Sequence, residues 1–113
     1  MNAYQGHERR THRVYVTGNS EYHVDGDVCV AVKNLVTGAF LAVHPALGKT
    51  LVGGLRFGDQ AALPHPSRVE AGDCLCFESA RTRIPVVTSQ LKSARRPSKR
   101  TVMAYPRKRH AGG

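Results

Sequence analysis

The stretch from Asp27 to His44 constrains the fold more than any other part of the sequence. Apolar residues alternate with their neighbours along 28–33 and again along 39–44, on either side of a short link that contains Asn34 and Gly38. Period-two alternation on both sides of an Asn/Gly link predicts a β-hairpin. Both faces are rich in apolar residues, so we expect the hairpin to lie centrally in a sheet that is covered on both sides. One predicted core face carries Val28, Val30 and Val32.

Short alternating runs between Gly, Pro and Asp turns make up most of the remaining chain. These runs cover 14–17, 21–24, 49–57, 74–78, 84–91 and 101–105. The glycines Gly53 and Gly54 predict a bend or a close backbone approach, whereas the proline-containing stretch 58–66 is expected to be a loop. No window shows helical periodicity over ten or more residues. The sequence therefore predicts an all-β fold, a small single-domain barrel or sandwich of about six to seven short strands.

The length of 113 residues suits one domain with a modest core. We expect a flexible basic arm over 1–13, a β-barrel domain over 14–105 and a disordered basic tail over 106–113. No run approaches the roughly 18 apolar residues that indicate a membrane span. The first 15 residues are polar and charged and contain no apolar signal-peptide core. These features predict a cytoplasmic location.

The positive charge of the protein is concentrated in its last third. The formal net charge is +9, and residues 81–113 contain ten of the 17 Lys and Arg but none of the eight Asp and Glu. Such an asymmetry indicates an anionic partner that is bound by one part of the molecule. The predicted polyanion-binding residues are Arg81, Arg83, Lys92, Arg95, Arg96, Lys99, Arg100, Arg107, Lys108 and Arg109.

The residue types in this basic third favour the phosphate backbone of nucleic acid as the partner. Phosphates attract cationic clusters by Coulomb attraction and by counterion release, and arginine suits bidentate phosphate contact. Tyr105 is the only aromatic residue among them, so we expect backbone contact with little sequence readout and make no choice between DNA and RNA. Docking of an acidic protein partner remains the alternative reading of the same charges.

The sequence carries no motif of enzyme chemistry. It contains no Gly-x-Ser-x-Gly elbow, no phosphate-binding glycine-rich loop and no His-Glu-x-x-His pair. We therefore predict a protein without enzymatic activity and without a cofactor. Asp25 and Asp27 lie in one predicted turn and Asp73 in another, and the paired acids are expected to be solvated turn formers rather than catalytic acids. The six histidines are scattered, and the sequence assigns no three of them to one site.

The three cysteines, Cys29, Cys74 and Cys76, form an odd set, which favours a reducing compartment. Cys74 and Cys76 share one face of a predicted strand. They could form a Cys-x-Cys metal or redox site, or they could be two small buried apolar residues. We favour the second reading because no further Cys or His pair stands at a metal-ligand spacing, and we predict no metal.

A second functional pattern links the N-terminal arm to the predicted hairpin. Arg9 and Arg13 have the spacing Arg-x-x-x-Arg, and the segment Asn34-Leu35-Val36-Thr37-Gly38 follows. Together these segments resemble the PilZ family, small β-barrels in which such an arm and an Asp/Asn-x-Ser-x-x-Gly strand clamp cyclic di-GMP. This resemblance implies a cyclic-dinucleotide site at Arg9, Arg13, Asn34 and Gly38. The sequence departs from that pattern, with Val36 in place of serine and one residue fewer before the glycine. A degenerate module of this kind would bind only a protein partner.

Overall fold

The computed structural model describes residues 11–58, 62–66, 69–79, 81 and 84–106. The elements are β1 (His12–Val16), β2 (Ser20–Asp25), β3 (Val28–Asn34), β4 (Thr50–Phe57), β5 (Ala62–Pro66), β6 (Cys74–Glu78), β7 (Val86–Gln90), β8 (Ser93–Arg95) and α1 (Lys99–Met103). All strands belong to one antiparallel sheet in the order β7-β6-β4-β3-β2-β1-β8, with β5 paired to β4 off this path. The predicted all-β class is confirmed, with eight strands rather than six or seven in a sheet that is not closed.

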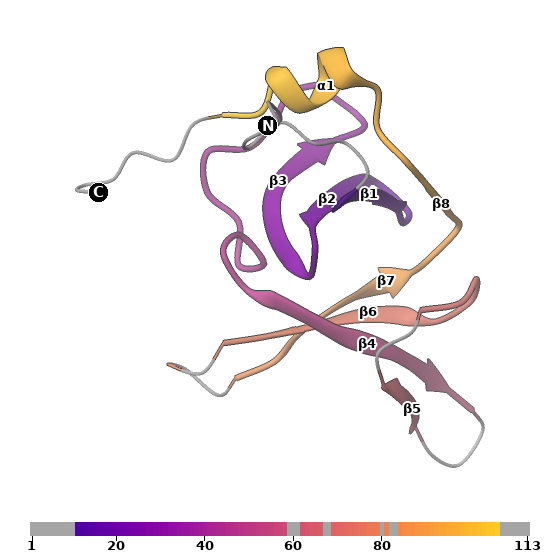
Figure 1. The fold of residues 1–113 in the computed structure, drawn as a ribbon. Helices are drawn as coiled ribbons and strands as arrows, with labels where there is room; N and C mark the ends of the chain where they lie inside the picture. The colour runs from indigo at the N-terminus through magenta and orange to yellow at the C-terminus, as the bar shows by residue number, and fades with distance from the viewer. Residues whose placement is uncertain (1–10, 59–61, 67–68, 80, 82–83, 107–113) are drawn as a thin grey trace.

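The sheet folds back on itself, so that β1, β2 and β3 face β4, β6 and β7 across the core (Figure 1). β3 and β4 pair at a single position, Val28 with Thr50, and this short pairing lets the two halves of the sheet diverge. The buried core between them consists of Tyr22, Val24, Cys29, Val32, Ala46, Leu75, Phe77 and Leu91. Within the described ranges, no helix has the length and hydrophobicity needed to cross a membrane.

Leu91 and Lys92 connect the two edges of the sheet directly. They join β7, which is one edge strand, to β8, which is the other. The Leu91 amide donates to the Asp73 carbonyl at 2.7 Å, the Lys92 amide donates to the Val16 carbonyl at 2.7 Å, and the Leu91 side chain is buried in the core. This crossing places Lys92 and the residues of β8 that follow it against β1.

The second strand of the predicted hairpin does not form, so this prediction is wrong. After β3, the Asn34 Oδ1 accepts hydrogen bonds from the amides of Val36 and Thr37, and residues 39–44 contain only one isolated bridge, Phe40 with Lys33. The chain then turns across the end of the core, where Ala46 is fully buried. Burying this side chain requires the chain to leave the edge of β3, which ends the expected pairing.

A β-bulge at Val30 also overturns the predicted core face of Val28, Val30 and Val32. The pairing with β2 jumps from Cys29, opposite Val24, to Ala31, opposite His23, so Val30 is the extra residue. A bulge shifts the alternation of side chains by one position. As a result Cys29 joins Val32 in the core, while Val28 remains 37 % exposed.

Two further segments differ from their predictions. The expected loop 58–66 contains β5, an edge strand that accommodates Pro64 and Pro66 because an edge strand can lack outward-facing donors. The expected strand 101–105 is instead occupied largely by α1. Its cap is Ser98, whose hydroxyl accepts from the Thr101 amide at 3.1 Å. Burial of Val102 against the sheet completes the docking of this short helix.

The close backbone approach predicted at Gly53 and Gly54 is present. A Cβ atom on Gly54 would lie 2.5 Å from Oδ2 of Asp73, so only glycine fits there without a shift. The side chain of Asp73, which the sequence placed in a turn, is completely buried. Its Oδ1 accepts from Nε of Arg56 at 2.9 Å and its Oδ2 accepts from the Glu70 amide at 3.0 Å. Asp73 is therefore a structural anchor beneath β4.

Candidate functional site

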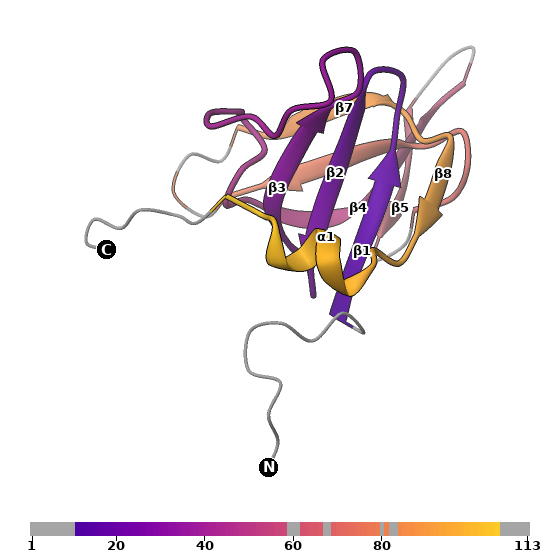
Figure 2. The same ribbon diagram turned by 90° about the horizontal axis from the view of Figure 1, so that it is seen from above.

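Five of the ten predicted polyanion-binding residues lie in residues 92–100, called the basic segment below. Its side chains Lys92, Arg95, Arg96, Lys99 and Arg100 are all exposed. Arg81 is also exposed but lies in the turn between β6 and β7, at the far end of the molecule from β8 (Figures 1 and 2). The remaining predicted residues, Arg83, Arg107, Lys108 and Arg109, lie outside the described residues.

Pairing with β1 fixes the first half of the basic segment. In β8, Ser93 lies opposite Val16, and Arg95 lies opposite Val14. Arg13 precedes Val14 on β1 and Arg96 follows Arg95, so the antiparallel register brings these two exposed arginines toward each other. Figure 2 shows β8 beside β1, with α1 crossing the outward face of β1, β2 and β3. Arg95 is therefore presented by a strand and Lys99 and Arg100 by a helix, whereas Lys92 and Arg96 lie in the connections on either side of β8.

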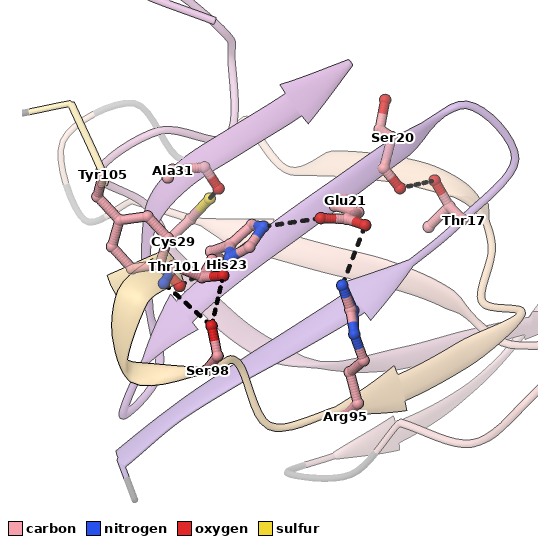
Figure 3. Close-up of polar contacts among 10 residues, drawn as sticks. All are labelled: Thr17, Ser20, Glu21, His23, Cys29, Ala31, Arg95, Ser98, Thr101 and Tyr105. Atoms are coloured by element: carbon pink, nitrogen blue, oxygen red, sulfur yellow. Dashed lines mark hydrogen bonds and ion pairs between the residues drawn. The ribbon is translucent and has the colours of Figure 1, made fainter. Parts of the chain in front are cut away.

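Arg95 of the basic segment and three side chains beneath it form a continuous polar network (Figure 3). Arg95 donates from a terminal guanidinium nitrogen to Oε2 of Glu21 at 3.2 Å, and the other Glu21 oxygen lies 3.0 Å from Nε2 of His23. The Nδ1 atom of His23 lies 2.7 Å from the hydroxyl of Tyr105, just beyond α1. The network thus attaches both β8 and the chain after α1 to β2.

The partners of His23 determine its tautomer. A carboxylate can only accept, so Nε2 donates to Glu21, and the neutral ring then accepts the Tyr105 proton at Nδ1. Burial lowers the pKa of His23, although the hydrogen bond and the charge of Glu21 act in the opposite direction. Burial, and then the Glu21 charge, raise the pKa of Tyr105. Both rings are therefore neutral near pH 7.

Aromatic contacts enclose this network. The ring centroid of Tyr105 lies 4.9 Å from that of His23 and 5.7 Å from that of Phe40, in edge-to-face arrangements. His23 is completely buried and also contacts Phe40 at 5.4 Å. The raised pKa of Tyr105 opposes transfer of its phenolic proton to His23. The network links the basic segment to β2 through Glu21 and His23.

The described residues implied by the PilZ resemblance, Arg13, Asn34 and Gly38, do not gather at one point. Arg9 lies outside the described residues. Arg13 pairs with Val24 near one end of β2, whereas Asn34 pairs with Ser20 at the opposite end. Asn34 and Gly38 form the turn after β3, in which the Gly38 amide donates to the Asn34 carbonyl at 2.8 Å and Gly38 has a positive φ of 77°.

The cysteines are placed as apolar side chains. Cys29 and Cys74 are buried and Cys76 is half-buried, and burial raises the pKa of each thiol, that of Cys29 to about 12. Over the described part of the chain, no group of three or more His, Cys, Asp or Glu is placed to hold a metal ion.

Sequence reasoning identified Arg95 but missed Glu21, His23 and Tyr105. Glu21 and His23 lie two residues apart on a strand, which gives them the same face, and this was the available local signal. Their partners are distant in sequence, since His23 and Tyr105 are 82 positions apart and Glu21 and Arg95 are 74 apart. Contacts of this range depend on the fold and have no sequence pattern.

The fold and the site define a small all-β domain with a basic segment held at one edge of its sheet. Comparisons with protein-family models, curated proteins and solved structures found no match to this chain.

Proposed function

We propose that the protein is a non-enzymatic module that binds a polyanion, most readily the phosphate backbone of nucleic acid, through the basic segment. The observation that carries this proposal is the exposure of five cationic side chains within residues 92–100, on backbone that is fixed at both ends. Arg13 on the neighbouring strand is exposed as well.

The charges of the basic segment are largely available to a ligand. Of the described acids, Glu21 pairs with Arg95, and no described carboxylate forms an ion pair with Lys92, Arg96 or Arg100. The Arg95 side chain remains 52 % exposed and uses one of its five donors on Glu21, so it can still bind a phosphate oxygen. Phosphate contacts at these side chains would release condensed counterions, the main driving force of non-specific nucleic-acid binding.

Fixed backbone lowers the entropic cost of binding. β8 is hydrogen-bonded to β1, Ser98 caps α1, and Tyr105 holds the chain beyond the helix. A partner that binds this surface orders side chains but not backbone, so less of the interaction energy is lost. Arg81 lies in a separate turn and receives none of this support.

The chemistry of the surface favours phosphate contact over base recognition. Of the aromatic residues near the basic segment, Tyr105 has its hydroxyl bonded to His23 and its ring packed against Phe40. Tyr15, opposite Ala94 of β8, packs against the core. The basic segment therefore provides no free aromatic ring on which a base could stack. We expect similar affinity for unrelated sequences, because phosphate contacts position a protein without specifying bases.

Fluorescence anisotropy with a labelled duplex, measured over a range of salt concentrations, tests the proposal. About five phosphate contacts give a slope of log K against log salt of about −4 to −5. The variant Arg96→Ala/Lys99→Ala/Arg100→Ala should flatten this slope by about 3, because each lost contact removes about 0.9. The variant Arg81→Ala is the matched control and should leave the slope nearly unchanged.

Two results would count against the proposal. Affinity that does not depend on salt would favour an acidic protein partner over a polyanion, and so would a triple variant that binds the duplex as tightly as the parent. A titration with cyclic di-GMP separates the PilZ-like alternative. Saturable binding that is lost in Arg13→Ala but kept in the triple variant would support that alternative instead.

A further inference from the structure

An apolar cleft opens beside β3 and extends to Tyr105. Its volume is about 610 Å³, and three stretches of chain line it: β3, the loop after β3, and the chain after α1. The lining residues are Val28, Cys29, Val30, Ala31, Leu41, Ala42, Leu47, Gly48, Tyr105 and Pro106. This volume falls within the range of roughly 300–1,000 Å³ that is typical of small-molecule sites.

Hydrogen bonds fix the walls of the cleft to one another. The loop is fixed to β3 at both of its ends, where the Leu41 amide donates to the Val32 carbonyl and the Gly48 amide donates to the Cys29 carbonyl, each at 2.8 Å. Between these two points the loop turns away from β3. The third wall is fixed through Tyr105 by its bond to His23. The cleft is therefore built into the fold and does not depend on a moving lid.

The lining is uncharged. Tyr105 carries the one hydroxyl among the lining residues, and that hydroxyl is bonded to His23. The Cys29 thiol donates to the Ala31 carbonyl at 3.7 Å, and its raised pKa keeps it protonated. A charged group inside the cleft would lose its hydration without gaining a side-chain partner, at a cost of several kcal/mol. An apolar group gains contacts with leucine, valine and the tyrosine ring.

We propose that this cleft binds a small, uncharged and mainly apolar molecule, whose ring or branched hydrocarbon part packs between Tyr105 and the leucines of the loop. The enclosing walls favour a small molecule over a second copy of the chain, because Leu41 and Leu47 are half-buried and recessed rather than presented on a flat surface. This site is separate from the polyanion-binding surface and does not depend on the function proposed for it.

Titration with the uncharged fluorophore N-phenyl-1-naphthylamine tests the proposal. Ala42 and Ala39 are both exposed and lie in the same loop, but Ala42 lines the cleft and Ala39 does not. Ala42→Phe should fill part of the cleft and weaken binding about tenfold or more, and Ala39→Phe should bind as the parent does. At high salt, the anionic relative 8-anilinonaphthalene-1-sulfonate should bind the cleft more weakly than N-phenyl-1-naphthylamine does.

Methyl resonances of the unmodified protein provide a test that needs no variant. Saturation with N-phenyl-1-naphthylamine should shift the methyl signals of Val28, Leu41 and Leu47 and leave those of Val87 on β7 unchanged. The proposal is overturned by an absence of saturable binding, by equal affinity of Ala42→Phe and the parent, or by shifts that spare the cleft. Self-association that Ala42→Phe abolishes, without binding of the fluorophore, would instead make the cleft an interface between copies.

Discussion

The two faces of β1, β2 and β3 are both covered, but they are stabilised by different chemistry. The inward face carries Tyr22, Val24 and Val32 and packs against the other half of the sheet. The outward face carries Glu21 and His23 and lies beneath α1 and the chain that follows it (Figure 2). The same strands therefore contribute to an apolar core on one side and to a polar network on the other.

Because of this difference, the two faces should lose stability in different ways when a side chain is removed. Apolar burial is non-directional and roughly proportional to area, so losing an apolar side chain costs its own transfer free energy and a term for the cavity it leaves. A buried polar network is directional, and losing one member leaves another without its partner. Among the described residues, every buried side-chain nitrogen or oxygen has a hydrogen-bond partner. The outward face thus depends on each of its members being present.

The largest expected loss of stability comes from truncating a large apolar side chain on the inward-facing side of the core. Phe77 is completely buried and contacts the ring of Tyr22 at 5.6 Å between centroids. Phe77→Ala should lower the free energy of unfolding by about 3–5 kcal/mol, because it removes a large apolar side chain and leaves a cavity. Urea unfolding followed by circular dichroism measures this loss. Phe57→Ala, at a side chain that is 57 % exposed, is the control and should change stability by less than about 0.5 kcal/mol.

A smaller loss of stability is expected from removing one hydrogen bond of the polar network on the outward face. Tyr105→Phe removes the hydroxyl that donates to His23 and leaves the buried Nδ1 atom without that donor. The expected cost is about 1–3 kcal/mol, the usual penalty for an unsatisfied buried polar group. Tyr15→Phe deletes a hydroxyl for which no described residue provides a hydrogen bond, and it should cost less than about 0.5 kcal/mol. Equal losses in the two variants would show that the polar network does not stabilise the fold.

The smallest effect is a dependence of stability on pH. Burial holds the pKa of His23 below its ordinary value of 6.5, despite Glu21, while Arg95 and Lys33 act in the same direction as burial. The unfolded chain therefore binds a proton at a higher pH than the native protein does. Stability should be complete above the ordinary pKa and should fall as the pH drops through that value toward the lowered one.

Thermal melts between neutral and mildly acidic pH measure this dependence. The pKa of His44 is also lowered by burial, so it contributes a slope of its own. His23→Gln should flatten the profile more than His44→Gln, because His23 is completely buried and His44 is only half-buried. A parent protein that becomes more stable on acidification would contradict the assigned neutral state of His23.

Alternation of apolar and polar residues predicted the strands that bury one face and leave the other more exposed. It located β6 at Cys74–Glu78 and placed β1, β2, β4 and β7 to within a few residues. It failed at 39–44, where tertiary burial of Ala46 draws the chain off the edge of β3, and at 101–105, where a short run fits a strand and a helix equally well. The helix cap at Ser98, three residues before Thr101, was the local signal that would have favoured a helix.

The candidate site was predictable in its charge but not in its geometry. Composition alone singled out Lys92, Arg95, Arg96, Lys99 and Arg100, since their charges are unopposed in the sequence around them. It could not separate them from Arg81, because the distance between two loops depends on the topology of the sheet. The polar network was not predictable, since its partners are joined only when β8 reaches β1.

The pairing of β8 with β1 also has a consequence for the order of folding. Glu21 and Arg95 are 74 positions apart, so closing this contact carries a large loop entropy, and such long-range pairings form slowly. During synthesis β1 is made well before β8, and it must wait with one edge unpaired until the basic segment emerges. The positive charges exist as soon as they are translated, but the surface that presents them forms only with this last pairing. A nascent or partly unfolded chain would therefore carry the charge without the ordered binding surface.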